Sequence, residues 1–354
     1  MLVLDATVVQ LQKICTSIFG GLAAVQHIPK IPLTSGPNIS YVASSPHRHR
    51  LPLSTVLYSS RILALVLNKS AHLQGANRKT TPPLASPRPI REMSPRREAS
   101  ATASSAGEDG NERVLSYGDV VLLRSDLTIL RGPHFLNDRI IAFYLAYLSS
   151  AFEVNDDDAD LLLLPPSIPY LLSNLPDPDS VAIVAEPIRL ASRRLVLLPV
   201  NDNPDASLAE GGSHWTLLVL DATAGASRPR FVHHDSLGVV NVHAARCLAT
   251  ALRPLLPGAD NGVPLVEGPT PMQVNGHDCG VYVVAVARAI CNWWRDSRGQ
   301  QQEGGTDWFD TVRKEVDAQS VKAMRAEMLH LIARLIQEKE EKKNKAMVEV
   351  SKEH

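Results

Sequence analysis

The chain has 354 residues, and its shift in composition fits one globular domain with a long extension better than two domains. Lys plus Arg number 36 against 37 Asp plus Glu, so the near-neutral charge gives no reason to expect a nucleic acid or an anionic membrane as a partner. Four dispersed cysteines form neither a disulfide framework nor a CxxC zinc signature, which indicates a reducing compartment, the cytoplasm and/or the nucleus.

Residues 1–112 form an extension with a composition of its own. No acidic residue occurs between Asp5 and Glu92, while Pro, Ser and Arg accumulate. The last third of this extension cannot bury enough apolar surface to fold, so it is predicted to be a disordered linker. The apolar patches before it are shorter than the ~20 residues that a membrane span needs. A plain extension is the preferred interpretation, and an acid-poor organelle transit peptide is the alternative.

The folded part is expected to begin at residue 113, with an apolar run over Val120–Leu123 and a Gly-Pro loop. Asn137 or Asp138 then begins a helix. Apolar residues recur along this helix at helical spacing, which indicates a side that faces the core. These residues are Ile140, Ile141, Tyr144, Leu145 and Leu148. The acidic stretch that follows, Asp156–Asp160, is most simply a solvated loop.

A β-hairpin is predicted beside a central strand. Leu195–Val200 is a continuous apolar run, which is typical of a buried strand. Trp215–Asp221 and Arg230–Asp235 are strand-like and are joined by a Gly-, Ala- and Ser-rich connection. If this connection has about six residues, His214 and Asp235 lie directly opposite each other at the open end, with Cβ atoms about 5 Å apart. A carboxylate in that position can orient an imidazole.

The histidines around Asp235 raise the question of a zinc site. His233 and His234 precede it directly, but the sequence contains no HExxH motif and no third ligand pair at regular spacing. No metal site is therefore predicted. Successive strand residues alternate between faces, so His234 is expected to pack or to face solvent on the side away from Asp235.

Cys279 stands where a polar loop meets an apolar run. Val281–Ile290 is interrupted only by a Tyr and an Arg and lacks Gly and Pro, which predicts a buried helix. Asp278 is the predicted N-cap. A thiol in the first turn lies at the positive end of the helix dipole, which favours its thiolate form. A small buried core cysteine is the alternative, and it suits Cys291 on the same helix.

Two further helices are expected to complete the domain. A surface helix follows Ser236, runs through Cys247 and is ended by Pro254. After a Gly- and Gln-rich connection, a C-terminal helix carries an apolar stripe that is predicted to pack onto the domain. The stripe consists of Val321, Met324, Met328, Leu331 and Leu335. Residues 341–354 are charged and are expected to fray.

His214, Asp235 and Cys279 supply a base, an orienting acid and a nucleophile in that order along the chain. The motifs that contain them, HWTLLVLD, HHDS and QVNGHDCG, resemble those of the sentrin/SUMO-specific (Ulp-type) cysteine protease family. Residues 122–148 and 197–221 resemble, more narrowly, the deneddylase branch, which acts on the Nedd/Rub modifier.

The resemblance covers residues 113–340 and implies an α+β, papain-like fold. Such a fold has a central mixed β-sheet flanked by helices, with the nucleophile at a helix N-terminus. By the same resemblance, His214, Asp235 and Cys279 are catalytic, and Gln273 stabilises the oxyanion. No cofactor is implied.

The resemblance also implies a substrate channel. Trp215 would cover the Gly-Gly tail of the modifier together with Phe135, which stands where the family commonly has a tryptophan. We expect Asn137 and Asp138 to contact the tail just before the glycines and, with the acidic stretch Asp156–Asp160, to favour Nedd/Rub.

The implied function is that of a cysteine-type peptidase or isopeptidase that cleaves after the Gly-Gly end of a ubiquitin-like modifier. The implied partners are Nedd/Rub and its conjugates such as modified cullins, and a monomer is expected. A SUMO-specific protease is an alternative, because the three catalytic residues do not select the modifier. A non-catalytic module that binds such a modifier is another, although all four chemical positions are present in the sequence.

Overall fold

The computed structural model describes residues 109–152, 160–205, 211–223, 229–256, 262–298 and 308–352. A five-stranded mixed sheet in the order β3-β4-β5-β6-β7 lies at the centre. Its strands are β3 (Leu161–Leu163), β4 (Leu195–Asn201), β5 (Trp215–Asp221), β6 (Arg230–His234) and β7 (Leu265–Glu267). β5 runs antiparallel to both of its neighbours, whereas β3 and β7 run parallel to β4 and β6. β1 (Arg113–Tyr117) and β2 (Val120–Leu123) form a separate antiparallel ribbon.

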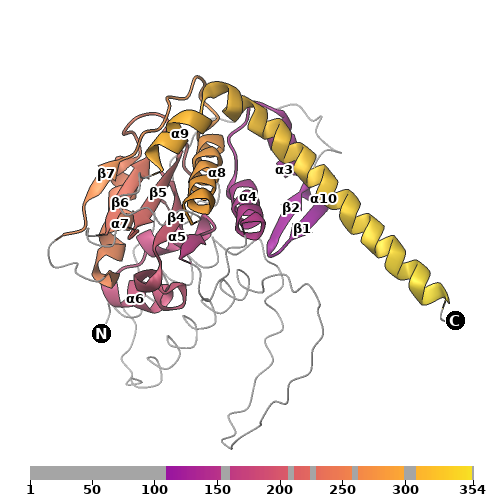
Figure 1. Ribbon diagram of the computed structural model, residues 1–354, viewed down its shortest axis with the longest axis horizontal. Coiled ribbons are helices and arrows are strands. Elements are labelled where there is room, and N and C mark those ends of the chain that lie inside the picture. Colours follow the sequence, from indigo (N-terminus) through magenta and orange to yellow (C-terminus); the bar gives the residue numbers. More distant parts are fainter. Residues whose placement is uncertain are drawn as a thin grey trace, which may run out of the picture.

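Helices cover both faces of the central sheet. They are α3 (Arg124–Arg131), α4 (Asp138–Ala151), α5 (Ser167–Ser173), α6 (Pro178–Ala185), α7 (Val242–Leu252), α8 (Cys279–Arg298), α9 (Phe309–Glu315) and α10 (Ala318–Lys352). One core lies between the sheet and the group α4, α8, α9 and α10, and a second lies between the sheet and the group α5, α6 and α7 (Figure 1). The predicted α+β fold with a mixed sheet flanked by helices is therefore confirmed. None of the helices described has a stretch long and apolar enough for a membrane span.

β4 is apolar without interruption from Leu195 to Val200 because both of its faces are buried there. Leu195 and Leu197 point into the first core, while Val196 and Leu198 point into the second. A strand covered on both sides needs apolar residues at every position, in contrast to the alternation of a half-exposed strand. The prediction of a central strand over Leu195–Val200 is confirmed.

α4 begins where the sequence predicted. The Oδ1 atom of Asn137 accepts a hydrogen bond from the backbone N–H of Ile140 at 3.0 Å, which is the contact of an N-cap residue. The five apolar residues expected on its inner side are all buried. This fixed start matters for function because the residues that precede α4 line the site described below.

The C-terminal part differs from the prediction in two ways. A short helix, α9, precedes the C-terminal helix, and the completely buried Trp308 lies just before it. In addition, α10 continues as a helix to Lys352, where fraying was expected from residue 341. Figure 1 shows α10 passing α3 and the β1–β2 ribbon and projecting beyond them. The projecting part is rich in Glu and Lys, which are good helix formers, and Gln337 contacts Glu341 one turn later at 3.1 Å.

Two predictions concern residues that lie outside the described part of the chain. These are the disordered extension, apart from its last few residues from Asp109 on, and the acidic loop, apart from Asp160. Asp160 stands directly before β3, where its carboxylate lies 3.4 Å from the guanidinium of Arg194. The apolar stripe of α10 packs on the first core as predicted.

Candidate active site

The β5–β6 hairpin brings His214 and Asp235 together. His214 directly precedes β5, Asp235 directly follows β6, and His214 Nε2 lies 2.7 Å from Asp235 Oδ1. The register differs from the prediction: the last pair of the ladder is Leu217 opposite His234, so His214 and Asp235 are diagonal and not directly opposed. A shift of two residues keeps both side chains on the same face of the sheet, because side chains alternate with a period of two. The predicted pairing of the side chains is therefore present despite the wrong register.

Backbone amides hold the Asp235 carboxylate in place. Oδ1 accepts a hydrogen bond from the N–H of Leu237 at 2.8 Å, and Oδ2 accepts one from the N–H of Asn241 at 3.0 Å. Burial raises the pKa of Asp235, but its hydrogen bonds with His214, Asn241 and Leu237 outweigh that effect and keep the pKa below its ordinary value. Asn241 is itself fixed, since its side chain donates to Thr216 Oγ1 at 3.1 Å. The carboxylate is therefore charged and rigid.

His214 is almost completely buried, with 3% of its surface exposed. Burial lowers its pKa, but the hydrogen bond with Asp235 and the nearby side chain of Cys279 outweigh it and raise the pKa to about 9. The other ring nitrogen, Nδ1, has no hydrogen-bond partner among the described residues. His214 is thus an imidazolium at neutral pH, positioned between a carboxylate and a thiol.

Cys279 is the first residue of α8, as predicted, and its side chain is buried. The backbone carbonyl of Asp278 accepts the N–H of Tyr282 at 2.9 Å, as an N-cap residue does. The Asp278 carboxylate, however, binds Arg325 and Asn275, so its side chain serves these contacts and not the capping role that was predicted. The thiol is held at the helix N-terminus by the backbone of α8 and by the loop before it.

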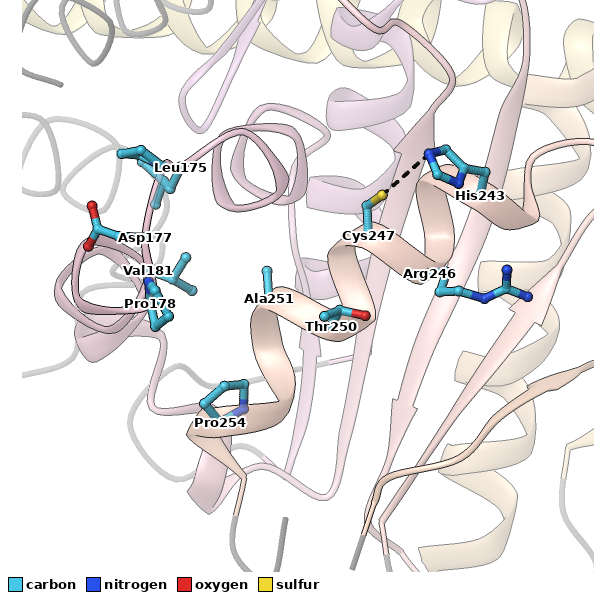
Figure 2. A pocket seen from close by; sticks show the side chains of 11 residues that line it. Leu175, Asp177, Pro178, Val181, His243, Arg246, Cys247, Thr250, Ala251 and Pro254 are labelled. Carbon is cyan, nitrogen blue, oxygen red and sulfur yellow. Dashed lines mark hydrogen bonds between the residues drawn. The ribbon is translucent and has the colours of Figure 1, made fainter. Parts of the chain in front are cut away.

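The other two described cysteines are placed differently. Cys291 is buried in α8, and burial raises the pKa of its thiol to about 12, so the prediction of a core cysteine is confirmed. Cys247 is exposed on α7, on the opposite face of the sheet from α8. Figure 2 shows its Sγ atom directed toward His243 Nε2, 3.7 Å away, at a pocket between α6 and α7. Cys279 is therefore the described cysteine that lies beside the His214–Asp235 pair.

Gln273 lies in the loop before α8, and its side-chain amide is oriented from both ends. Its Oε1 atom accepts a hydrogen bond from Ser236 Oγ at 2.7 Å, and its Nε2 atom donates to the carbonyl of Asn275 at 2.6 Å. The backbone N–H of Gln273 also donates to the carbonyl of Ser236 at 2.9 Å. Since Ser236 follows Asp235, the residue next to the carboxylate sets the position of this glutamine.

Trp215 and Phe135, the two aromatic residues predicted to form the channel, lie on two segments that contact each other. The indole N–H of Trp215 donates to the carbonyl of Leu136 at 3.0 Å, and Phe135 is 49% exposed. Gly280 allows a close approach here, because a Cβ atom at that position would lie 2.9 Å from Leu136 Cβ. The segment before α4 therefore packs directly against the first turn of the helix that carries Cys279.

Asn137 and Asp138 differ in what their side chains do. The Asn137 amide is occupied at both ends, since it caps α4 and donates to Asp126 Oδ1 at 2.7 Å. Asp138 is exposed. Asp126 was not foreseen: it is completely buried and also accepts the N–H of Leu123 at 2.8 Å and the guanidinium of Arg139 at 2.9 Å. A lone Asp in the sequence carries no signal of burial, because its partners lie in another element.

The neighbouring histidines serve packing roles. His233 Nδ1 lies 3.0 Å from a Glu267 carboxylate oxygen, and His234 Nε2 accepts the indole N–H of Trp308 at 3.0 Å. Burial, assisted by the nearby His233, lowers the pKa of His234 to about 3, so it is a neutral acceptor. The expectation that His234 packs is confirmed. In the part of the chain that the structure describes, no group of three His, Cys, Asp or Glu side chains could hold a metal ion.

Known proteins match this chain over most of their length. Over 228 aligned residues it is 42% identical to NEDD8-specific protease 1 from Arabidopsis thaliana. The aligned region covers 64% of this chain and 96% of that protein. Over 183 aligned residues it is 33% identical to sentrin-specific protease 8 from Homo sapiens. The aligned region covers 51% of this chain and 83% of that protein. A crystal structure of the de-sumoylating protease superposes on this chain with a TM-score of 0.48 and a sequence identity of 18%. The superposition covers 64% of this chain and 91% of that one. No family model matches the chain.

Proposed function

Since the chain belongs to the sentrin-specific (Ulp-type) cysteine protease family, in the branch of the NEDD8-specific proteases, we propose that it is a deneddylase. It cleaves the peptide or isopeptide bond that follows the Gly-Gly end of a ubiquitin-like modifier of the Nedd/Rub type. One observation carries this proposal: the 2.7 Å contact between His214 and Asp235 lies beside Cys279 at the start of α8. Base, orienting acid and nucleophile are thus assembled from three separate elements.

The attack begins with the thiolate of Cys279. The His214 imidazole takes up or shares the thiol proton, and the resulting imidazolium stabilises the thiolate by its charge. The sulfur then attacks the carbonyl carbon of the terminal glycine of the modifier, and the carbonyl oxygen becomes an oxyanion. His214 gives its proton to the leaving amine, which departs as a lysine side chain or a free N-terminus.

Gln273 and the backbone N–H of Cys279 are the proposed donors to this oxyanion. The side-chain amide of Gln273 has two N–H groups, and the bond to Asn275 uses one of them. The second is free to donate to the oxyanion, while Ser236 prevents the amide from rotating. One such donor contributes on the order of 3 kcal/mol to the stabilisation of the transition state in enzymes where it has been removed.

Hydrolysis completes the cycle. A water molecule, deprotonated by His214, attacks the thioester, and the sulfur leaves as the Cys279 thiolate with the imidazolium restored. The modifier is released with a free Gly-Gly carboxylate. The same steps serve the maturation of a precursor and the release of a modified lysine, because the two reactions differ only in the amine that leaves.

The proposed channel for the Gly-Gly tail lies between Trp215 and Phe135. Glycine lacks a Cβ atom, so two aromatic side chains can close over the tail without a clash. The bond from Trp215 to the Leu136 carbonyl supports this assignment, because it ties the two walls together. Asp138, exposed at the start of α4, is the proposed contact with the residues just before the glycines.

We also propose Nedd/Rub conjugates such as modified cullins as substrates, a monomeric state, and a location in the cytoplasm and/or the nucleus. A reduced nucleophile is required for the reaction, and the free thiols Cys247, Cys279 and Cys291 support a reducing compartment.

The test is a parallel incubation with Nedd/Rub, SUMO and ubiquitin that each carry an electrophile at the C-terminus. We expect a covalent adduct with the Nedd/Rub probe, located at Cys279 by mass spectrometry, and at most slow reaction with the other two. Faster labelling by the SUMO probe would overturn the choice of modifier while leaving the cysteine protease intact. Binding of Nedd/Rub without labelling by any probe would instead favour a non-catalytic module.

A further inference from the structure

Arg325, on the C-terminal helix α10, contacts the backbone on both sides of the candidate active site. Its guanidinium donates to Asp278 Oδ1 at 2.7 Å and to the His277 carbonyl at 3.3 Å, directly before Cys279. The same group donates to the His134 carbonyl at 2.7 Å and to the Ile129 carbonyl at 3.2 Å, in the segment that leads to Phe135. One side chain therefore joins the two backbone segments that flank the nucleophile.

These contacts are shielded from solvent. The side chain of Arg325 is 12% exposed and that of Asp278 is 8% exposed, so the ion pair between them is screened little by water or salt. Ile129 belongs to the last turn of α3, where carbonyls lack partners within the helix and a cation is favourable. Met324 and Met328, next to Arg325 on α10, are completely buried and hold its backbone against the core.

The geometry suits arginine in particular. A guanidinium is a planar fork with five N–H donors, and it can satisfy a carboxylate and several carbonyls at once. A lysine carries its charge at one point on a flexible stem and cannot span two loops in the same way. The loop before Cys279 has its own internal brace, since Asn275 Oδ1 accepts the N–H groups of His277 and Asp278, each at 3.0 Å. Arg325 adds the link from this braced loop to the rest of the site.

We propose that Arg325 is a positioning residue for the peptidase reaction, which fixes the backbone that carries Cys279 relative to the segment that carries Phe135. The inference rests on the proposed function and assigns the C-terminal helix a part in catalysis. The guanidinium of Arg325 contacts Asp278 and backbone carbonyls and does not touch the reacting atoms. The effect on rate comes from alignment, because a displacement of about 1 Å at a reacting group can lower a rate by about a hundredfold.

The experiment compares Arg325→Met, Arg325→Lys and the control Arg334→Met, whose arginine lies on the same helix in an exposed pair with Glu338. All carry Cys15→Ala and Cys247→Ala, and burial raises the pKa of the Cys291 thiol to about 12, so that alkylation by iodoacetamide reports on Cys279. We expect Arg325→Met to lower kcat on a Nedd/Rub fusion and the alkylation rate by about tenfold or more, with a changed pH profile of alkylation. The kcat and the alkylation rate of Arg325→Lys should lie between those of Arg325→Met and those of the wild type. Both values of Arg334→Met should match the wild type.

The outcomes are separable. If Arg325→Met fails to fold, Asp278→Asn tests the same link from its other end and should lower kcat in the same direction. A lower melting temperature with an unchanged kcat and an unchanged alkylation profile would show a merely structural role and overturn the inference. Wild-type kcat in Arg325→Lys would overturn it as well. A wild-type enzyme that reacts with none of the three modifier probes counts against the proposed function, whereas alkylation of Cys279 needs no modifier.

Discussion

The chemistry of the site depends on the surroundings of His214. Burial alone would leave this histidine neutral, yet the charged carboxylate of Asp235 and the side chain of Cys279 keep it protonated. Asp235 can act in this way because two backbone N–H groups keep it charged inside the protein. A chain of hydrogen bonds thus extends from the backbone of the loop after β6 to the imidazole beside Cys279, the proposed nucleophile.

The first prediction concerns the nucleophile. Cys279→Ala should lower cleavage of a Nedd/Rub fusion by about ten-thousand-fold or more and leave binding of the modifier intact, because only the attacking atom is removed. Steady-state kinetics and calorimetric binding measure the two effects. Cys247→Ala and Cys291→Ala serve as controls and should keep turnover largely intact. The assignment is wrong if either control abolishes probe labelling while Cys279→Ala retains it.

The second prediction concerns pH. His214 has an ordinary pKa of 6.5 that is raised to about 9, so kcat/KM should persist to about pH 9 and then fall as the imidazolium is lost. The same shift stabilises the fold: this contribution is complete below pH 6.5 and is lost as the pH rises through about 9. In Asp235→Asn the pH at which kcat/KM falls should move down by about one pH unit or more. Burial still lowers the pKa of His214 in this variant, and the carboxylate that raised it is absent. An unchanged limit in that variant would contradict the proposed coupling.

Among the elements, α9 and the residue before it tie the C-terminal region to the sheet. The ring of Trp308 lies 5.7 Å from that of Trp293 on α8, and its N–H reaches His234 at the end of β6. The guanidinium of Arg230, at the start of β6, lies 5.7 Å from the same ring. A buried aromatic residue thus joins α8 to β6, the strand that Asp235 directly follows.

The third prediction concerns this contact. Trp308→Ala should lower the free energy of unfolding by about 3–5 kcal/mol, because a large buried ring is replaced by a cavity. Trp308→Phe retains most of the ring but leaves His234 Nε2 without its donor, and should cost about 1–3 kcal/mol. Urea denaturation measures both values. A loss below about 1 kcal/mol in Trp308→Ala would show that the contact contributes little to stability.

The part of the chain that the structure describes is one domain whose last helix continues beyond it. From Gln337 to Glu349 the residues of α10 are exposed, whereas Met324 and Met328 are buried. Arg325 lies in the packed part of the helix. The molecule therefore needs the first half of α10 for its site, and the projecting half adds no core.

The fourth prediction follows from this division. A shortened chain of residues 107–340 should fold, melt within about 2 °C of the full chain and retain full kcat/KM on a small modifier fusion, because residues 341–349 are exposed and residues 1–106 contain none of the predicted site residues. Thermal melts and steady-state kinetics test it. Ending the chain before Arg325 is the matched comparison and should abolish activity. A loss of several degrees in the 107–340 chain would show that a removed segment packs on the domain.

The sequence by itself determined several of the elements and the residues that are proposed to carry the chemistry. The apolar run of β4, the cap of α4 and the buried helix after Cys279 follow from local patterns, because burial on one or both sides dictates which residues an element can contain. His214, Asp235, Gln273 and Cys279 stand out because their residue types and their motifs carry a chemical signal of their own.

Only the tertiary structure decided how these parts meet. The register of β5 and β6 places His214 diagonal to Asp235, because it is set by packing along the whole hairpin and not by the length of its connection. Asp126, Trp308 and Arg325 find their partners in segments far away along the chain, and a residue's own neighbours in the sequence say nothing about such contacts. Hydrogen bonds between distant segments exist only after the chain has folded, so the residues that align the site were visible only in the structure.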